Sequence, residues 1–275
     1  MSALGAGRVS CHNVLGLGIM TKNLVRVRAG LCLLLLGCSA EPDAPPLESS
    51  IVQPIIGGVE DSGTGAHPAV VMLINGNGAC TASLIAPKLV LTARHCVSQN
   101  LQPGIGCDIY GNSTNGNHVG NDFSPASFEV LTGVNPNFGG TPAAIGAQLF
   151  HPPGQNLCNN DIALLVLNKA VTGVTPLQVR LDWGPQAGEM TTAVGYGSVN
   201  DAQQGSGKRR RRPNVPVLTA GQDWNHITGA GELAVGQAAC AGDSGGPVIS
   251  AAGSVIGVAS RVANCNDPNT SAKYV

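Results

Sequence analysis

Three polar residues in separate stretches of the sequence have the types and surroundings needed for chemistry on a carbonyl group. His95 follows the apolar run 89–91, so we expect the end of a buried strand to hold its imidazole in place. Asp161 leads directly into the apolar run 162–167. A carboxylate there loses its water, which is unfavourable unless it accepts hydrogen bonds, and an imidazole N–H is a suitable donor. Glycines around Ser244 permit a tight backbone and let a substrate carbonyl approach main-chain N–H groups.

The segments around these residues resemble the three motifs of the chymotrypsin-like (trypsin family) serine proteases. They read TARHC at 92–96, DIALL at 161–165 and GDSGGP at 242–247, in the order His, Asp, Ser that the family has. The resemblance covers about residues 55–275. A GDSGGP segment together with a T-A-x-H-C segment in the right order is a specific signal, whereas a lone GxSxG is not. The resemblance implies a serine endopeptidase.

The resemblance also implies a role for each residue. Ser244 Oγ attacks the scissile carbonyl, His95 takes its proton and later protonates the leaving amine, and Asp161 fixes the imidazole tautomer and stabilises the imidazolium. The backbone N–H groups of Gly242 and Ser244 form the oxyanion hole. Taken singly, each residue has another interpretation: Ser244 between glycines is typical of a turn, Asp161 before a strand of a cap, and His95 of a surface position. The alternative for all three together is a non-catalytic homologue that keeps the fold and binds partners.

The composition favours an all-β protein. Glycine and proline number 38 and 18, and long helical patterns laced with charge are absent. The resemblance implies two six-stranded antiparallel β-barrels packed face to face, with the active site in the cleft between them. His95 and Asp161 then belong to the first barrel and Ser244 to the second. The stretch 104–140 is rich in Gly, Asn and Ser and predicts a loop region that carries insertions.

The charge of the chain indicates no nucleic-acid or acidic partner. The formal net charge is -1, and 11% of residues are charged. No CxxC pair or HExxH motif is present, so we expect no metal and no cofactor. Protein or peptide substrates are the expected partners of a monomer. The run KRRRR at 208–212 predicts a solvated loop, because five adjacent cations repel one another, with a polyanion patch or a cleavage site as the functional alternatives.

The N-terminal region has the pattern of an export signal. Residues 20–38 combine three basic side chains with the apolar run 31–36, which is too short to span a bilayer. Their last four residues, LLGC, resemble the lipobox of bacterial lipoproteins, which implies lipidation of Cys38 as the mature N-terminus. The alternative is an ordinary signal peptide with an incidental cysteine. Met20 is a candidate start in place of Met1, because residues 1–19 precede the basic region.

These patterns divide the chain into three parts. Residues 1–38 are an upstream segment and lipoprotein-type signal peptide, and residues 39–54 are a polar, proline-rich linker or propeptide. Residues 55–275 are a trypsin-like peptidase domain. We expect an exported protein of the bacterial cell envelope or exterior, either anchored to a membrane by a lipid or secreted.

The nine cysteines suggest an oxidised domain. Cys11 and Cys32 lie in or before the signal, and Cys38 is the lipidation candidate, so six remain in the body. Six cysteines allow 15 connectivities, and spacing alone does not choose among them. The resemblance implies the pairs Cys80–Cys96 and Cys240–Cys265, and Cys107–Cys158 is the pair that remains without a family precedent.

The segment that begins at Ile55 resembles the new N-terminus that forms when zymogens of the family are cut. It reads IIGG, and the resemblance implies that the freed Ile55 ammonium pairs with Asp243 and orders the oxyanion loop. The residue before it is Pro54 and not the usual arginine or lysine. The activating protease is therefore not trypsin-like, or the cut lies elsewhere.

The resemblance also implies a primary substrate pocket. The position six residues before the nucleophile is Ala238, so a bound lysine or arginine has no counter-charge and loses its water unpaired. Val262 falls where chymotrypsin and trypsin have glycine, which narrows the mouth of the pocket. We therefore expect a preference for small aliphatic P1 residues. The expected pocket residues are Ala238, Ser260, Val262 and Ala272.

The C-terminus departs from the family pattern. The sequence stops at Tyr274 and Val275, where the family continues with a last strand and a helix. Either the sequence is a fragment that is incomplete at this end, or its end is unusual, and a barrel that lacks a strand is expected to have an open edge.

Overall fold

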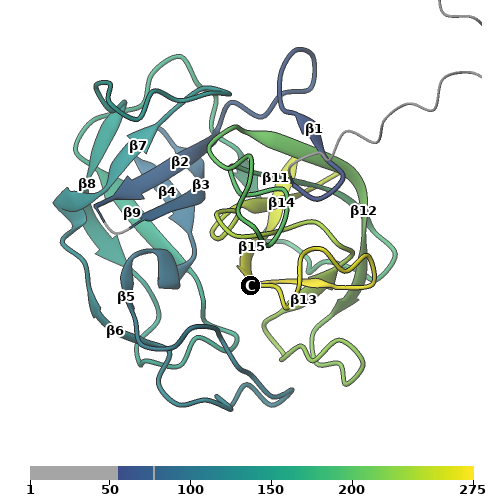
Figure 1. The fold of residues 1–275 in the computed structure, drawn as a ribbon. Helices are drawn as coiled ribbons and strands as arrows, with labels where there is room; N and C mark the ends of the chain where they lie inside the picture. Colours follow the sequence, from purple (N-terminus) through teal and green to yellow (C-terminus); the bar gives the residue numbers. More distant parts are fainter. Residues whose placement is uncertain (1–54, 77) are drawn as a thin grey trace, which may run out of the picture. The chain divides into compact units, whose positions relative to one another are not determined.

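Sixteen strands and two short 3₁₀ turns make up the part of the chain that the computed structural model describes, residues 55–76 and 78–275 (Figure 1). The predicted signal at 1–38, the linker at 39–54 and the lipidation candidate Cys38 lie outside these residues. Neither turn in the described part has the length of a membrane-crossing helix. The all-β class expected from the sequence is confirmed.

The first barrel is a closed ring of six antiparallel strands. Alternate residues of each strand point inward, as in β9, where Ala163, Leu165 and Leu167 are buried and the residues between them are half-exposed. Their side chains join Leu84, Val90 and others in one apolar core. In ring order the strands are β2 (Val70–Asn75), β3 (Gly78–Ala86), β4 (Leu89–Thr92), β9 (Ala163–Leu167), β8 (Ala144–Phe150) and β7 (Glu129–Leu131).

The second barrel is also a closed antiparallel ring of six strands, as the sequence predicted. The expected open edge is not found among the described residues. The last strand, β16, pairs with β15 on one side and with β13 on the other, because the backbone of 272–274 is extended between them. In ring order the strands are β11 (Met190–Gly195), β12 (Arg210–Ala220), β13 (Leu233–Val235), β16 (Ala272–Tyr274), β15 (Ser254–Arg261) and β14 (Pro247–Ser250).

Short elements complete the two barrels. β1 pairs with β12, β10 runs parallel to β15, and β5 and β6 form a separate ladder beside the first barrel. Their bounds are β1 (Val59–Glu60), β5 (Ser98–Asn100), β6 (Val119–Asp122) and β10 (Gln178–Val179), with 3₁₀ turns η1 (Arg94–Cys96) and η2 (Pro125–Ser127).

The prediction that the basic run 208–212 forms a solvated loop is wrong. β12 begins inside the run and pairs with β1, which brings the cations against Glu60 and Asp61. Lys208 Nζ lies 2.8 Å from a Glu60 carboxylate oxygen, and Arg209 Nε lies 2.7 Å from Asp61 Oδ2. Arg209 is 3% exposed. Opposite charges at the end of β1 and directly after it thus offset the mutual repulsion of the run.

The basic run therefore holds the segment that follows Ile55. Arg212 donates hydrogen bonds to the carbonyls of Ile56 and Gln237, so it links this segment to the second barrel. Asp61 is fully buried and also accepts hydrogen bonds from His67. Burial alone raises the pKa of Asp61, but the His67 and Arg209 contacts outweigh it and hold the pKa below its usual range.

Candidate active site

His95 lies at the end of the first barrel, in η1 directly after β4. The disulfide Cys80–Cys96 ties this turn to β3. The backbone N–H of His95 donates to Asp161 Oδ1 at 2.9 Å, and His95 Nδ1 lies 2.7 Å from Asp161 Oδ2. A neutral imidazole that donates Nδ1–H to this carboxylate has its lone pair on Nε2.

Asp161 is fully buried just before β9, so its charge needs compensation. Ser260 of β15 supplies a third donor, with its Oγ 2.7 Å from Asp161 Oδ2. The sequence interpretation named Ser260 only as a pocket residue and missed this contact. No local signal predicts it, because Ser260 is 99 positions from Asp161 in the chain.

Burial and pairing act against each other in the His95–Asp161 pair. Burial raises the pKa of Asp161, but the adjacent His95 and the hydrogen bonds from His95 and Ser260 lower it overall. Burial lowers the pKa of His95, and the attraction of Asp161 more than offsets this, so the pKa is raised above its ordinary value. The pair is therefore arranged to stabilise an imidazolium.

The loop that carries Ser244 is anchored to both barrels. The Ser244 carbonyl accepts from Thr81 N–H of the first barrel at 2.9 Å, and Gly245 N–H donates to the Ala259 carbonyl of the second at 2.8 Å. Gly245 has a φ of 79°, and a Cβ there would overlap Thr92 Oγ1 and the Thr81 carbonyl. Glycine at this position therefore lets the serine loop approach the strands that lead to His95.

Ser244 and His95 line one cleft of about 880 Å³, together with residues of both barrels. Gly242 has a φ of 93°, and its carbonyl accepts from Thr81 Oγ1 at 2.8 Å. The N–H groups of Gly242 and Ser244 have no hydrogen-bond partner among the described residues.

The structure separates the expected pocket residues into two groups. Ser260 and Val262 line the cleft. Ala238 and Ala272 are 0% and 1% exposed and lie behind it, in the apolar core of the second barrel. Sequence reasoning missed Arg261, which lines the cleft between Ser260 and Val262. The signal was present in the sequence, since Arg261 stands between two of the expected pocket residues.

Asp243 and Ile55 are both buried in the second barrel. Asp243 accepts hydrogen bonds from Gly197 N–H at 2.8 Å and Cys240 N–H at 2.9 Å. Burial nevertheless raises the pKa of Asp243 to about 7. Ile55 is 1% exposed and packs in the same apolar core as Ala238. The hydrogen bonds to the Asp243 carboxyl group therefore do not fully offset the cost of burying its negative charge, so this group does not ionise easily.

The described residues contain three disulfides, and they are the three pairs expected from the sequence. Two groups of metal-ligand side chains occur in the same part of the chain, one around His95 and one around Asp201. Both include the two cysteines of a disulfide, whose sulfurs are not thiolates, so neither group suits a metal ion. The disulfides themselves fit an oxidising, extracellular environment.

Comparisons with known proteins agree with this geometry. The trypsin family model matches residues 55–275. Trypsin from Squalus acanthias is 30% identical over 71% of this chain and 79% of its own, and the cercarial protease of Schistosoma mansoni is 29% identical over 71% and 76%. The solved structure of neuropsin, a serine protease of mouse brain, superposes with a TM-score of 0.55 at 19% identity, covering 79% of this chain and 92% of that one.

The chain belongs to the trypsin family of serine proteases. The likeness to neuropsin shows that the fold is shared. Homologues in this family act on proteins and peptides, which is the substrate class that the family implies for this chain.

Proposed function

We propose that this protein is a serine endopeptidase that hydrolyses peptide bonds through an acyl-enzyme on Ser244. The observation that carries the proposal is the buried Asp161–His95 hydrogen bond, completed by Ser260, in a cleft that Ser244 also lines. The matching family model supports the same reaction. The alternative, a non-catalytic homologue that binds partners in this cleft, has no specific observation in its favour.

In the proposed acylation step, Ser244 Oγ forms a bond to the scissile carbonyl carbon and its proton passes to His95 Nε2. The oxyanion accepts hydrogen bonds from the N–H groups of Gly242 and Ser244. The C–N bond then breaks, and His95 gives its proton to the leaving amine. Asp161 keeps its negative charge throughout and stabilises the imidazolium through Nδ1–H.

In deacylation, a water molecule takes the place of the leaving amine. His95 Nε2 accepts a proton from the water as its oxygen attacks the acyl carbon, and the same proton returns to Ser244 Oγ when the ester bond breaks. The product is a free carboxylic acid. Both steps use only this chain's own residues, the substrate and water.

A fluorophosphonate probe tests the proposed activity, because it reacts only with an activated serine. We expect the protein processed at Ile55 to be labelled stoichiometrically on Ser244, as read by intact mass and peptide mapping. A His95→Ala variant should lose labelling, since the base is gone. A correctly folded and processed protein that the probe does not label would favour the non-catalytic alternative.

We further propose a preference for small aliphatic P1 residues. Val262 lines the cleft, and Ala238 and Ala272 behind it carry no charge and little volume. A long cationic side chain would therefore lose its water without a counter-charge. Arg261 and Lys273, which also line the cleft, add to this by repelling a P1 lysine or arginine.

Chromogenic peptides that differ only at P1 measure this preference. We expect Ala and Val to give kcat/KM values at least tenfold above Arg, Lys and Phe, since one methylene in such a pocket is worth about 1–3 kcal/mol. Val262→Gly widens the expected mouth and should raise kcat/KM for Phe relative to Ala. Faster cleavage after Arg or Phe by the unaltered enzyme would mean that this pocket assignment is wrong.

We also propose export, followed by membrane attachment through a lipid on Cys38 or by secretion. The three disulfides support an oxidising compartment. Activation by a cut before Ile55 belongs to the same proposal, and the buried Asp243 carboxyl group, whose pKa is raised by burial, supports it because a freed ammonium would compensate its charge.

A further inference from the structure

A long loop of the first barrel forms one wall of the cleft. It spans residues 101–118, between β5 and β6, and Figure 1 shows it extending below the barrels toward the loop that follows β12. The segment 102–107 of this loop lines the same cleft as Ser244 and Arg261. Substrate that enters the cleft therefore lies between this loop and the end of β15.

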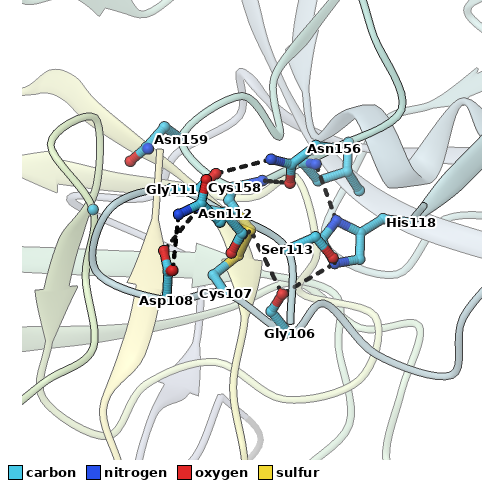
Figure 2. The surroundings of a disulfide bond; sticks show 12 residues. Gly106, Cys107, Asp108, Gly111, Asn112, Ser113, His118, Asn156, Cys158 and Asn159 are labelled. Carbon is cyan, nitrogen blue, oxygen red and sulfur yellow. Dashed lines mark hydrogen bonds between the residues drawn. A yellow bond between two sulfur atoms is a disulfide. The ribbon is translucent and has the colours of Figure 1, made fainter. Parts of the chain in front are cut away.

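The loop is held rigidly to the segment just before Asp161. The disulfide Cys107–Cys158 joins the two, and Asn156 Nδ2 donates to the Gly111 carbonyl at 2.8 Å (Figure 2). His118 is 2% exposed and accepts the Leu157 N–H on Nδ1 at 3.1 Å. Burial lowers the pKa of His118, which keeps that acceptor unprotonated.

The same loop reaches the second barrel. Gln222 Nε2, in the loop between β12 and β13, donates to the Ile109 carbonyl at 3.1 Å. The rings of Tyr110 and Trp224 meet edge to face with centroids 6.0 Å apart. Asn159 Oδ1 accepts the Gly231 N–H at 3.0 Å. We call these contacts between 109–110, Asn159 and 222–231 the loop bridge.

The loop bridge is fastened to the wall of the cleft. Glu232, at the end of the second loop, is 3% exposed and pairs with Arg261, whose Nη2 lies 2.8 Å from Glu232 Oε2. The same nitrogen donates to the Ile227 carbonyl at 3.1 Å. Both Arg261 and Ile227 line the cleft. The loop bridge therefore adjoins the side of the cleft that Arg261 forms.

The position of this wall indicates which half of a substrate meets the bridge. The P1 residue stays with the acyl half when the scissile bond breaks, and its proposed pocket is walled by Ser260 and Val262. Arg261 lies between Ser260 and Val262 in the chain, so residues that precede P1 and run along this strand pass Arg261. Beyond Arg261 lie Glu232, Ile227 and the loop bridge.

We propose that the loop bridge closes the acyl side of the cleft, so that the enzyme accepts only a short segment before the scissile bond. This inference rests on the proposed peptidase activity and adds to it a limit on substrate length. The preferred substrates are peptides cut close to their amino terminus. Tyr110 and Trp224 hold the loop bridge together, because their ring contact joins the two loops, and neither side chain lines the cleft itself.

A length series of peptides tests the limit. The peptides share one P1 alanine and one chromogenic leaving group, and carry from one to five residues before the scissile bond. Active-site concentration is measured by fluorophosphonate labelling. In the unaltered enzyme we expect kcat/KM to be at least tenfold lower for the longest peptide than for the best short one.

Opening the bridge should remove this penalty. In the double variant Tyr110→Ser with Trp224→Ser, kcat/KM for the longest peptide should rise about tenfold and that for the shortest should not change. Trp183→Ser, which alters another exposed tryptophan, away from the cleft, serves as the matched control and should keep the original length profile. Gln222→Ala removes a single bridge hydrogen bond and should show a smaller effect in the same direction.

The possible results separate the two proposals. If fluorophosphonate labels Ser244 and kcat/KM rises with each added residue in the unaltered enzyme, the loop bridge does not limit length and this inference is overturned alone. If the probe fails to label the processed protein, the proposed function is overturned and the inference falls with it.

Discussion

Replacing Ser244 by alanine should lower kcat for peptide hydrolysis by about 10⁵- to 10⁶-fold, because the atom that forms the acyl bond is removed. His95→Ala should lose about as much. The double variant should lose little more than either single variant, since the two residues act as one unit. Initial rates with a chromogenic peptide, corrected for the amount of folded protein, measure the effect.

The Ser244→Ala substitution should not change the fold or its stability. The contacts that anchor the loop use backbone atoms of Ser244 and Gly245, and alanine keeps them. We expect Ser244→Ala to change the melting temperature no more than Ser127→Ala does. Ser127 lies in the exposed turn η2, so its variant is the control. Turnover near that of the unaltered enzyme in Ser244→Ala would refute the proposed mechanism.

Replacing Asp243 by asparagine should have opposite effects before and after processing at Ile55. In the uncut chain the carboxyl group is buried and its pKa is raised to about 7. The folded state therefore binds this proton more tightly than the unfolded state does. The contribution of Asp243 to stability falls as pH rises from about 4 to 7, by up to about 4 kcal/mol, and stays low above pH 7.

An amide in place of this acid has no charge to bury, so the uncut Asp243→Asn chain should be more stable than the unaltered uncut chain at pH 8 and similar to it near pH 4. Urea unfolding at the two pH values measures this difference. Asp182→Asn, which alters an exposed aspartate, is the control and should show no such change.

After processing, the same substitution should be harmful. The proposed ion pair between the Ile55 ammonium and Asp243 is then lost, and breaking a buried pair costs about 3–5 kcal/mol. Since that pair is expected to order the N–H groups of Gly242 and Ser244, kcat/KM should fall at least a hundredfold. N-terminal sequencing must first show Ile55 as the mature end. Full activity of a chain that still carries residues before Ile55 would contradict this account.

The fold was predictable because three short motifs in the sequence indicate the family, and the family implies the fold. The segments around His95, Asp161 and Ser244 predicted the family, and the family model and the two closed barrels confirm it. The prediction of an open edge in the second barrel was wrong, because it was inferred from the length of family members. Strand closure depends on which backbones lie side by side, and β16 has β13 and β15 as neighbours.

The basic run 208–212 shows the limit of local charge patterns. Five adjacent cations predict a solvated loop only when no acid is near, and Glu60 and Asp61 lie almost 150 positions earlier in the chain. Pairing of β1 with β12 brings them together. Arg209 is buried for this reason, and Arg212 of the same run positions the segment after Ile55.

The sequence by itself determined the residue types at the site, the order of its three motifs and an even set of six cysteines in the body. These are local features, and a residue type at a fixed spacing needs no knowledge of its distant neighbours. The tertiary structure alone decided that Ser260 supports Asp161, that Arg261 pairs with Glu232, and that the loop at 101–118 meets the loop at 222–231. Each of these contacts joins segments that only barrel closure and packing bring within hydrogen-bonding distance.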